Sequence, residues 1–286
     1  MAVDNSGPFI KISSPCPNVR LVELARKPVN AFTDEFWAEY GRVFDDMATL
    51  TEDIRAVVVS SAFPKIFSAG IDFQGLSSLD GHDTEPARLG YITRRHILEF
   101  QRAISAPERC PFPVVAAVHG MVIGLGIDII AACDIRYAAS DTTFSIKEVD
   151  VGLAADIGTL AHLPKITANQ SLARELAYTA RPFSSAEAEK LGLVSKVIDG
   201  GREAVVREAL ALAKVIASKS PVAVIGTKHL LLHARDHSVA ENLEYTAIWN
   251  GAMVQSQDLK EAVNAGISKS KTLPVFPPLR SVPSKL

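Results

Sequence analysis

The sequence has little cysteine and no strong bias of charge, and both absences exclude whole classes of protein. Its three cysteines, Cys16, Cys110 and Cys133, are an odd number at wide spacing with no CxxC pair. This pattern argues for reduced thiols and against both a disulfide framework and a zinc site. With 30 basic and 32 acidic residues the formal net charge is -2, so a nucleic-acid partner is not expected.

Several signals of targeting and chemistry are also missing. There is no GxSxG elbow and no Walker sequence, and the first residues lack the basic and apolar regions of a secretory signal. Residues 114–133 are about as long as a membrane span. Because His119, Asp128 and several glycines interrupt this segment, we expect a strand, a glycine turn and a buried helix, and no membrane span.

What is present predicts an α/β protein with a large core. The chain has 286 residues, of which 48% are hydrophobic and 22% charged. Apolar runs predict strands that alternate with amphipathic helices, and the chain from Ser184 onward is almost entirely helical in pattern. A capping box, Ser184 with Glu187, begins one of these helices. Residues 76–87 are expected to form a polar loop before a helix that runs through 94–104.

Three acidic residues lie in a very apolar segment and are the first candidates for chemistry. Asp128, Glu148 and Asp156 are surrounded by Ile, Leu, Val and Ala. Carboxylates in such surroundings are costly unless they are paired, hydrogen-bonded or chemically employed. Glu148 is expected at the end of a strand over 142–148. Each acid alone could also be a surface residue or a helix cap, and Asp156 is well placed to cap a helix that follows it.

Other polar residues nearby are expected to be structural. Asp134 is predicted to pair with a neighbour such as Arg136, and Asp150 with Lys147. His119 precedes a glycine at a strand end, and we expect it to be a packing residue with its polar atoms satisfied.

Two glycine-containing turns precede these acids. Ser68, Ala69 and Gly70 follow an apolar strand, whereas Gly124 and Gly126 flank the start of the helix that carries Asp128. Backbone N–H groups at such turns, one at a helix N-terminus, are suited to holding an oxyanion. Taken alone, a glycine turn is a weak signal and more often is only a tight connection between two elements.

The joint spacing of both turns and all three acids resembles a known family. The segments are "FSAGID", "HGMVIGLGIDIIAACDIRYAASDTTFSIKEVDVGLAADIGTLAHLPK" and "SPVAVIGTK". They resemble the enoyl-CoA hydratase/isomerase (crotonase) superfamily, and "KEVDVGLAAD" is similar to its Δ3,5-Δ2,4-dienoyl-CoA isomerase branch. The resemblance implies a crotonase-like spiral of ββα repeats over residues 1–200 that holds the active site. It also implies a helical region over 201–286 through which subunits assemble into trimers or hexamers.

The resemblance further implies an acyl-CoA substrate and an isomerisation in fatty-acid β-oxidation. The thioester oxygen would be held by the N–H groups of Ile71 and Leu125, where the family usually has glycine at the position of Leu125. Further substrate contacts are implied at the following residues: Lys27, Lys65, Ala69, Gly70 and Gly124. The two lysines match positions that often contact CoA phosphates, and they are equally consistent with solvated surface lysines.

A dienoyl isomerase must move a proton from C2 to C6, which requires a base and an acid set apart along the acyl chain. Glu148 is the predicted base, Asp156 the predicted acid, and Asp128 is expected to tune their protonation. No metal or redox cofactor is expected, because the reaction is a proton shift. The alternatives are an enoyl-CoA hydratase, a Δ3-Δ2 enoyl-CoA isomerase and, from another class, a non-catalytic acyl-CoA-binding subunit.

The last three residues of the sequence, Ser284, Lys285 and Leu286, are the tripeptide read as a peroxisomal address. The preceding "PPLRSVP" has the composition of a flexible, exposed tail. We therefore expect an import receptor as a partner and the peroxisomal matrix as the location.

Overall fold

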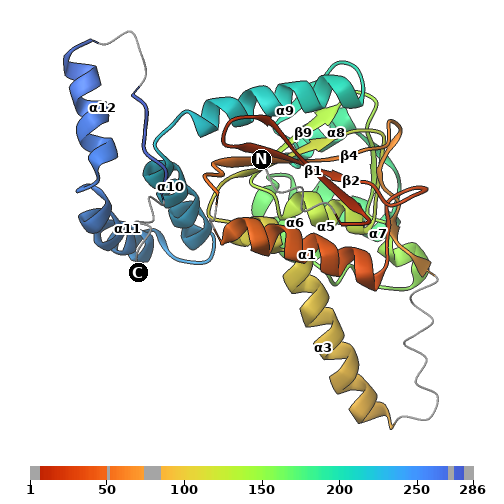
Figure 1. Ribbon diagram of the computed structural model, residues 1–286. Coiled ribbons are helices and arrows are strands. Elements are labelled where there is room, and N and C mark those ends of the chain that lie inside the picture. Colours follow the sequence, from red (N-terminus) through yellow and green to blue (C-terminus); the bar gives the residue numbers. More distant parts are fainter. Residues whose placement is uncertain (1–6, 50–51, 74–84, 270–273, 280–286) are drawn as a thin grey trace.

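The computed structural model describes residues 7–49, 52–73, 85–269 and 274–279 (Figure 1). A six-stranded sheet runs through the larger body. Its antiparallel edge pair is β1–β2, and every other neighbouring pair is parallel. In order across the sheet the strands are β1 (Ile10–Cys16), β2 (Val19–Leu24), β4 (Ala56–Ser61), β7 (Val114–Val118), β9 (Ile135–Ala139) and β12 (Lys196–Ile198).

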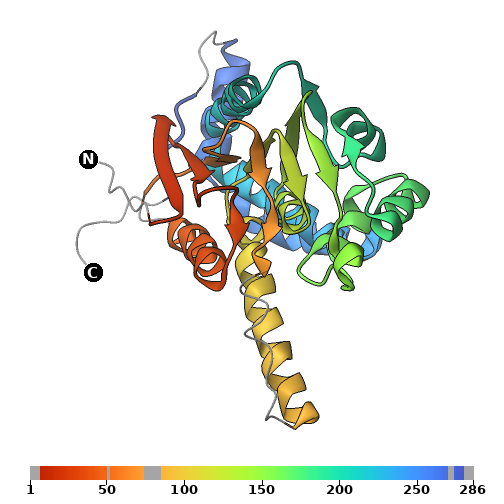
Figure 2. The ribbon, with the colours of Figure 1, turned by 90° about the vertical axis from the view of Figure 1, so that its right-hand side faces the viewer.

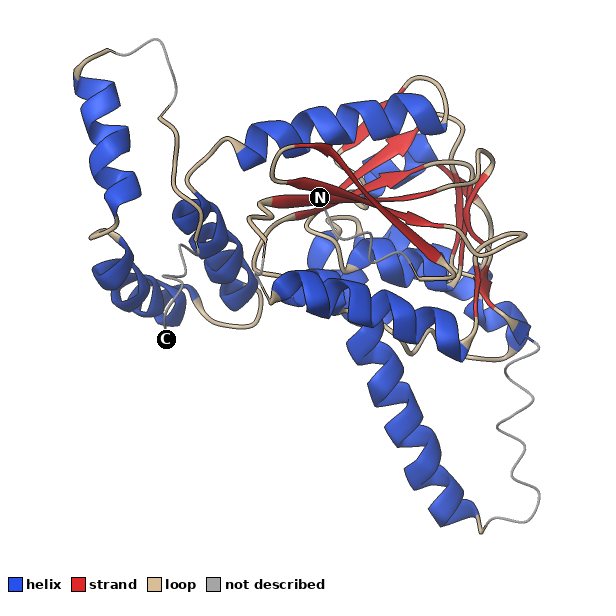
Figure 3. Cartoon of the chain, in the orientation of Figure 1, coloured by secondary structure: helices blue, strands red, loops and turns tan. Residues whose placement is uncertain are grey.

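The central strands β4 and β7 are buried along their whole length because both faces of the sheet are covered by helices (Figure 3). Successive side chains alternate between two hydrophobic clusters. Val57 and Val59 face the cluster that includes α1 (Asp34–Ala48), whereas Val58 faces the cluster that includes α9 (Arg202–Ala217). The uninterrupted apolar runs of the sequence therefore correspond to strands that are buried on both sides.

A second, smaller set of strands lies beside the main sheet and carries the turns of interest. Four strands form one sheet, and β3 (Ala31–Phe32) pairs with β6 (Gly70–Ile71) in parallel. The four are, in order, β11 (Phe183–Ser184), β10 (Thr143–Ser145), β8 (Met121–Ile123) and β5 (Ile66–Ser68). Along the chain, a strand of the main sheet is followed by a strand of this second set and then by a helix, which is the ββα repeat predicted from the resemblance.

The remaining helical elements follow from the same repeats. Residues 114–133 form β7, β8 and α5 (Leu125–Ala131), as predicted, and α5 is entirely buried. The capping box of Ser184 and Glu187 is present at the start of α8 (Ser185–Leu191), which ends at Gly192 in the left-handed conformation. The others are α3 (Pro86–Ile104), α4 (Ala106–Arg109), η2 (Glu148–Val151), α6 (Thr159–Ile166) and α7 (Gln170–Thr179).

Helix α3 extends away from the rest of the molecule in both views (Figures 1 and 2). It begins at Pro86, and the side chain of Glu85 caps it by accepting hydrogen bonds from the N–H groups of Ala87 and Arg88. The predicted loop thus ends earlier than residue 87, and its residues 76–84 lie outside the described residues. Only the last turns of α3 are buried in the body, at Phe100, Ala103 and Ile104.

Three helices follow α9 and lie to the side of the main sheet (Figure 1). They are α10 (Pro221–Ala234), α11 (Val239–Met253) and α12 (Gln257–Ile267). Lys228 joins α10 to the body, because its ammonium group donates to the carbonyl oxygens of Pro107 and Phe112 and lies 2.7 Å from an Asp134 carboxylate oxygen. Asp134 therefore pairs with Lys228 and not with Arg136, so the predicted partner was wrong, whereas Asp150 pairs with Lys147 as predicted.

The division at residue 200 remains a prediction. Helix α9 contributes Val205, Ala209 and Ala213 to a core cluster of the main sheet. This packing joins α9 to the main sheet and favours a boundary after Ala217.

Candidate active site

One pocket brings together both glycine turns and all three acidic residues. Its volume is about 360 Å³, and it lies between β6, the start of α5, the segment from η2 to α6, and the buried end of α3. The residues that line it are Ala69, Gly70, Ile71, Phe73, Phe100, Ile123, Gly124, Leu125, Asp128, Lys147, Glu148, Val151, Leu153, Asp156 and Ile157.

The first turn is held in place by two buried polar side chains. Asn30 donates to Ser61 Oγ at 2.8 Å and to the carbonyl oxygen of Phe67 at 2.9 Å. Ser68 Oγ donates to the carbonyl oxygen of Asn30 at 2.8 Å and accepts from the N–H of Gly70 at 3.1 Å. These bonds fix the backbone immediately before Ile71.

The backbone N–H groups of Ile71 and Leu125, the predicted oxyanion donors, lie at two neighbouring turns. The N–H of Asp72 donates to the carbonyl oxygen of Phe32 on β3. Because successive N–H groups of a strand point in opposite directions, the N–H of Ile71 points away from β3. Leu125 is the first residue of α5, where an N–H has no carbonyl partner within the helix. The turns touch, since a Cβ added at Gly70 would lie 3.6 Å from Leu125 N.

Gly124 is required by both conformation and space. Its φ of 50° with ψ of -116° is a backbone conformation that residues with a side chain disfavour. A Cβ at this position would lie 3.3 Å from Glu148 Oε1. The second turn therefore lets the carboxylate of Glu148 approach the N-terminus of α5 closely.

The three acids come from different elements and differ in burial. Asp128 lies in the first turn of α5, is 1% exposed, and its Oδ1 accepts from the N–H of Thr159 at 2.6 Å. Glu148 begins η2, and its Oε2 is buried with no hydrogen-bond partner among the described residues. The strand β10 ends at Ser145, so the prediction that Glu148 ends a strand was wrong.

The alternative considered for Asp156, a cap for the helix that follows it, is not borne out. Helix α6 begins at Thr159 with Gly158 as its N-cap residue, and Asp128 accepts from the first helical N–H. Asp156 thus lies two residues before the N-cap and lines the pocket, where its carboxyl group is available for another role.

Burial raises the pKa values of all three carboxyl groups. It raises the pKa of Asp128 from an ordinary 3.8 to about 6, against the effect of the hydrogen bond from Thr159. Burial, with a contribution from the charge of Asp128, raises the pKa of Glu148 to about 7. The pKa of Asp156 is also raised by burial. Groups that exchange protons near neutral pH are suited to general acid and base chemistry.

Comparison with known proteins identifies the family. Residues 17–272 match the model of the enoyl-CoA hydratase/isomerase family. The chain belongs to this family. It is 48% identical to the human mitochondrial Δ(3,5)-Δ(2,4)-dienoyl-CoA isomerase, over 92% of this chain and 80% of the relative. It is 44% identical to the peroxisomal isomerase of the same name from Arabidopsis thaliana, over 85% of this chain and 87% of that protein.

The fold is that of the enoyl-CoA hydratase/isomerase family as well. The crystal structure of enoyl-CoA hydratase from Bacillus anthracis superposes with a TM-score of 0.82 at 24% identity, covering 94% of this chain and 98% of that one. The crotonase-like fold predicted from the sequence is therefore confirmed.

Two predicted contacts of this family lie outside the pocket. Lys27 and Lys65 are exposed and do not line it. Lys65 immediately precedes β5, and the loop that contains Lys27 accepts a hydrogen bond at Val29 from the N–H of Ala69. The side chain of Leu125, where the family usually has glycine, is 4% exposed and belongs to the main core cluster.

Sequence reasoning missed the apolar wall of the pocket and one polar contact behind it. Phe73, Phe100, Val151, Leu153 and Ile157 supply the wall. Their positions follow from tertiary packing, and no spacing in the sequence marks them. The polar contact is a hydrogen bond from Gln101 to the main chain of Asp156.

Two further findings concern metals and membranes. Among the residues that the structure describes, no group of three or more His, Cys, Asp or Glu side chains could hold a metal ion. No single described helix is long and apolar enough to cross a membrane, although α9 and α10 together have sufficient length and composition, with a bend of 110° between them.

Proposed function

We propose that this protein catalyses the isomerisation of 3,5-dienoyl-CoA to 2,4-dienoyl-CoA by moving a proton from C2 to C6. The observation that carries the proposal is the third carboxyl group, since Asp156 shares one largely apolar pocket with Asp128 and Glu148. The names of the human and Arabidopsis relatives, at 48% and 44% identity, support it.

In the proposed mechanism, the thioester oxygen accepts hydrogen bonds from the N–H groups of Ile71 and Leu125. Glu148, as a carboxylate, removes a proton from C2, and the electron pair of that C–H bond delocalises into a trienolate that extends from the thioester oxygen to C6. Donors aimed at the developing oxyanion are typically worth about 10²–10³ in rate each. Asp156, in its protonated form, then donates its proton to C6 while the thioester carbonyl re-forms.

One turnover leaves Glu148 protonated and Asp156 ionised, so proton exchange with solvent restores the starting state. The raised pKa of Asp156 favours the protonated acid that the second step needs. Asp128 contributes in two ways: its charge raises the pKa of Glu148, and its Oδ1 holds the start of α6 close to Asp156. Because only protons move, the reaction requires neither a metal nor a redox cofactor.

The substrate's CoA moiety would lie at the pocket rim. Lys27 and Lys65 are the proposed phosphate contacts. Lys65 is connected to the first turn through β5, and the loop of Lys27 is connected to it by the hydrogen bond from the N–H of Ala69 to the carbonyl oxygen of Val29. The backbone at Ala69, Gly70 and Gly124 would lie against the thioester, where the absence of side chains at the two glycines allows close approach.

We also propose assembly and location. The helical region after α9 would form trimers or hexamers, and Ser284, Lys285 and Leu286, which lie outside the described residues, would direct the protein to the peroxisome. The relatives support an organelle but differ in which one, since the human protein is named mitochondrial and the Arabidopsis protein peroxisomal.

The purified protein should be assayed side by side with 3,5-dienoyl-CoA and 2-enoyl-CoA. Isomerisation lengthens the conjugation with the carbonyl and increases absorbance at longer wavelength, whereas hydration of a 2-enoyl thioester removes conjugation. We expect kcat/KM for isomerisation of 3,5-dienoyl-CoA to be higher than kcat/KM for hydration of 2-enoyl-CoA. Efficient hydration without isomerisation would make the protein a hydratase and contradict the proposal.

A further inference from the structure

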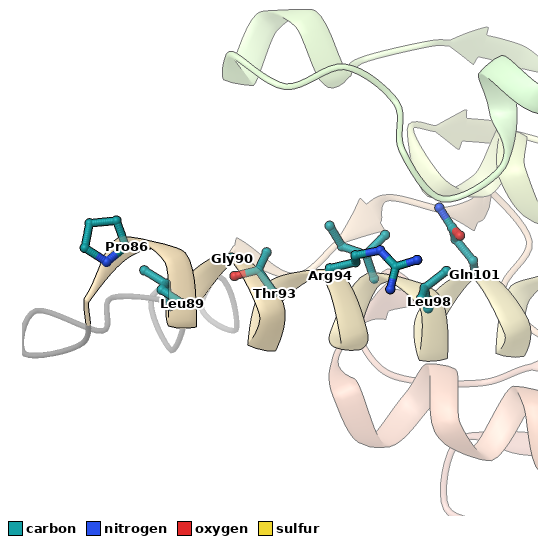
Figure 4. Close-up of a pocket in the computed structure, with 8 residues that line it drawn as sticks. Pro86, Leu89, Gly90, Thr93, Arg94, Leu98 and Gln101 are labelled. Carbon is teal, nitrogen blue, oxygen red and sulfur yellow. The ribbon is translucent and has the colours of Figure 1, made fainter.

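A single side chain joins the end of α3 to the proposed acid. Gln101 Nε2 donates a hydrogen bond of 2.5 Å to the main-chain carbonyl oxygen of Asp156, 55 residues away in the sequence. Figure 4 shows Gln101 on the part of α3 nearest the body. Its amide group points away from the helix axis, toward a neighbouring segment of the same chain. The contact is to the backbone of Asp156, so it leaves the carboxyl group free.

Ala155 and Ile157 pack the segment that carries Asp156 against the core, but hydrogen bonds to its backbone are few among the described residues. Residues 152–158 are Gly-Leu-Ala-Ala-Asp-Ile-Gly and form neither helix nor strand. At one end the N–H of Leu153 bonds to the carbonyl oxygen of Glu148, and at the other the N–H of Thr159 bonds to Asp128. Gln101 holds the backbone between these two points, at the residue whose side chain lines the pocket.

The donor itself comes from a firmly packed part of α3. Its neighbour Phe100 is 3% exposed and stacks on Trp37 of α1, with ring centroids 5.0 Å apart and an interplanar angle of 21°. Phe100 also forms part of the pocket wall. A polar group that projects from a packed helix can hold a loop more accurately than another loop residue can.

We propose that Gln101 is a positioning residue that sets the carboxyl group of Asp156 against the remote end of the acyl chain. It thereby supports the second proton transfer, to C6, and not the first, from C2. This rests on the proposed isomerase function. Gln101 lies behind Asp156 and acts through its backbone, whereas Glu148 and the two oxyanion donors are held by other elements.

The test separates the two proton transfers. Gln101→Met keeps the length and helix propensity of the side chain but removes the donor. Each variant is assayed for isomerisation of 3,5-dienoyl-CoA and, in deuterated solvent, for exchange of the C2 proton. For Gln101→Met we expect kcat for isomerisation to fall about 10-fold, the equivalent of one ordinary hydrogen bond, with C2 exchange and KM nearly unchanged.

Two control variants give the contrast. Gln255→Met removes a bond of the same kind, from Gln255 Nε2 to the carbonyl oxygen of Gly251, at an exposed site on the C-terminal side of α11. It should alter neither rate. Ser68→Ala disturbs the turn before Ile71, so it should lower exchange and isomerisation together. Gln101→Glu, which has the same shape and no donor when ionised, provides a second variant if Gln101→Met folds poorly.

Equal losses of exchange and isomerisation in the Gln101 variants would overturn the proposal, as would no loss in either. A wild-type protein that hydrates 2-enoyl-CoA and does not isomerise 3,5-dienoyl-CoA would refute the proposed function as well, and that result is visible before any variant is made.

Discussion

Glu148 combines buried surroundings with an unpaired carboxylate oxygen, which suits a base and poorly suits a structural residue. Its Oε2 has no partner among the described residues, and its Oε1 lies close to Gly124 at the start of α5. A structural carboxylate in such surroundings would normally be hydrogen-bonded or paired. We therefore predict that Glu148→Gln lowers kcat by at least about 10²-fold, the lower range for general acid–base catalysis, and changes KM far less.

The pH dependence gives the same residue a second test. A base must be ionised, and the pKa of Glu148 is raised to about 7. Because the mechanism needs Glu148 ionised and Asp156 protonated at the same time, the wild-type kcat/KM should pass through a maximum and fall at both lower and higher pH, whereas the residual rate of Glu148→Gln should lose the limb that Glu148 sets. Glu189→Gln, an exposed glutamate on α8, serves as the control. A normal rate in Glu148→Gln would mean that another residue is the base.

Asp156 is the residue that separates isomerisation from hydration. Asparagine keeps the volume of the side chain and cannot donate a carboxylic proton. Because Asp156 does not cap α6, the fold and melting temperature of Asp156→Asn should stay close to those of the wild type. Isomerisation should fall by at least about 10²-fold, while exchange of the C2 proton in deuterated solvent largely survives. Normal isomerisation by this variant would remove Asp156 from the mechanism.

Among elements, the sequence predicts well those whose signals are local. The buried strands β4 and β7, the glycine turn before α5 and the capping box of α8 all arise from residues within a few positions of one another. Periodicity and turn chemistry carry this information because they act along the chain. The juxtaposition of the two glycine turns is different, because Gly70 and Gly124 are far apart in the sequence and only the family resemblance implied that they meet.

Contacts between distant segments could not be predicted in this way. Asp128 holds the start of α6 from 31 residues away, whereas the sequence offered Asp156, close to that helix, as an alternative cap. Asp134 pairs with Lys228 from 94 residues away, although Arg136 is nearer in the sequence. In each case a suitable local partner exists, and tertiary packing selects a different one.

Lys228 connects α10 to the body and provides a prediction at the scale of elements. Its ammonium group is buried and contacts two carbonyl oxygens as well as Asp134. Lys228→Met would leave the carboxylate of Asp134 largely buried without its cation, and removing one partner of a buried pair typically costs about 3–5 kcal/mol. Because Asp134 is partly accessible, we expect a loss of about 2–3 kcal/mol in the free energy of unfolding, measured with denaturant.

A double variant isolates the ion pair from the packing. Asp134→Asn can still accept the hydrogen bond from the N–H of Val114 and no longer carries a charge. Combined with Lys228→Met, it should recover part of the lost stability, so the two changes should cost less together than their sum. Strict additivity would show that Lys228 acts through its two carbonyl contacts alone.

At the scale of the whole molecule, the exposed apolar side chains of the C-terminal helices predict a contact between subunits. Helix α11, all of which the structure describes, has no buried residue, and Leu243 and Ile248 on it are 65% and 71% exposed. Such a surface is costly in water and is typical of a subunit contact. We predict a stable oligomer at micromolar concentration, and Ile248→Glu should dissociate it while the control Glu244→Ala should not. Sedimentation of wild-type protein as an active monomer of 30.7 kDa would contradict this.

Location in the cell is decided by the last three residues if the proposed address is correct. Deleting Ser284, Lys285 and Leu286 should strand the protein in the cytosol, as seen by fluorescence of an N-terminal fusion, and leave its activity in vitro unchanged. The deletion must be expressed in cells without the intact protein, because an oligomer that contains one intact subunit could carry truncated subunits into the organelle. Deleting residues 280–283 instead keeps the tripeptide at the end of the chain and should preserve import. Import of the truncated protein under these conditions would show that another segment carries the address, and a mitochondrial destination, like that in the name of the human relative, would then be the one to test.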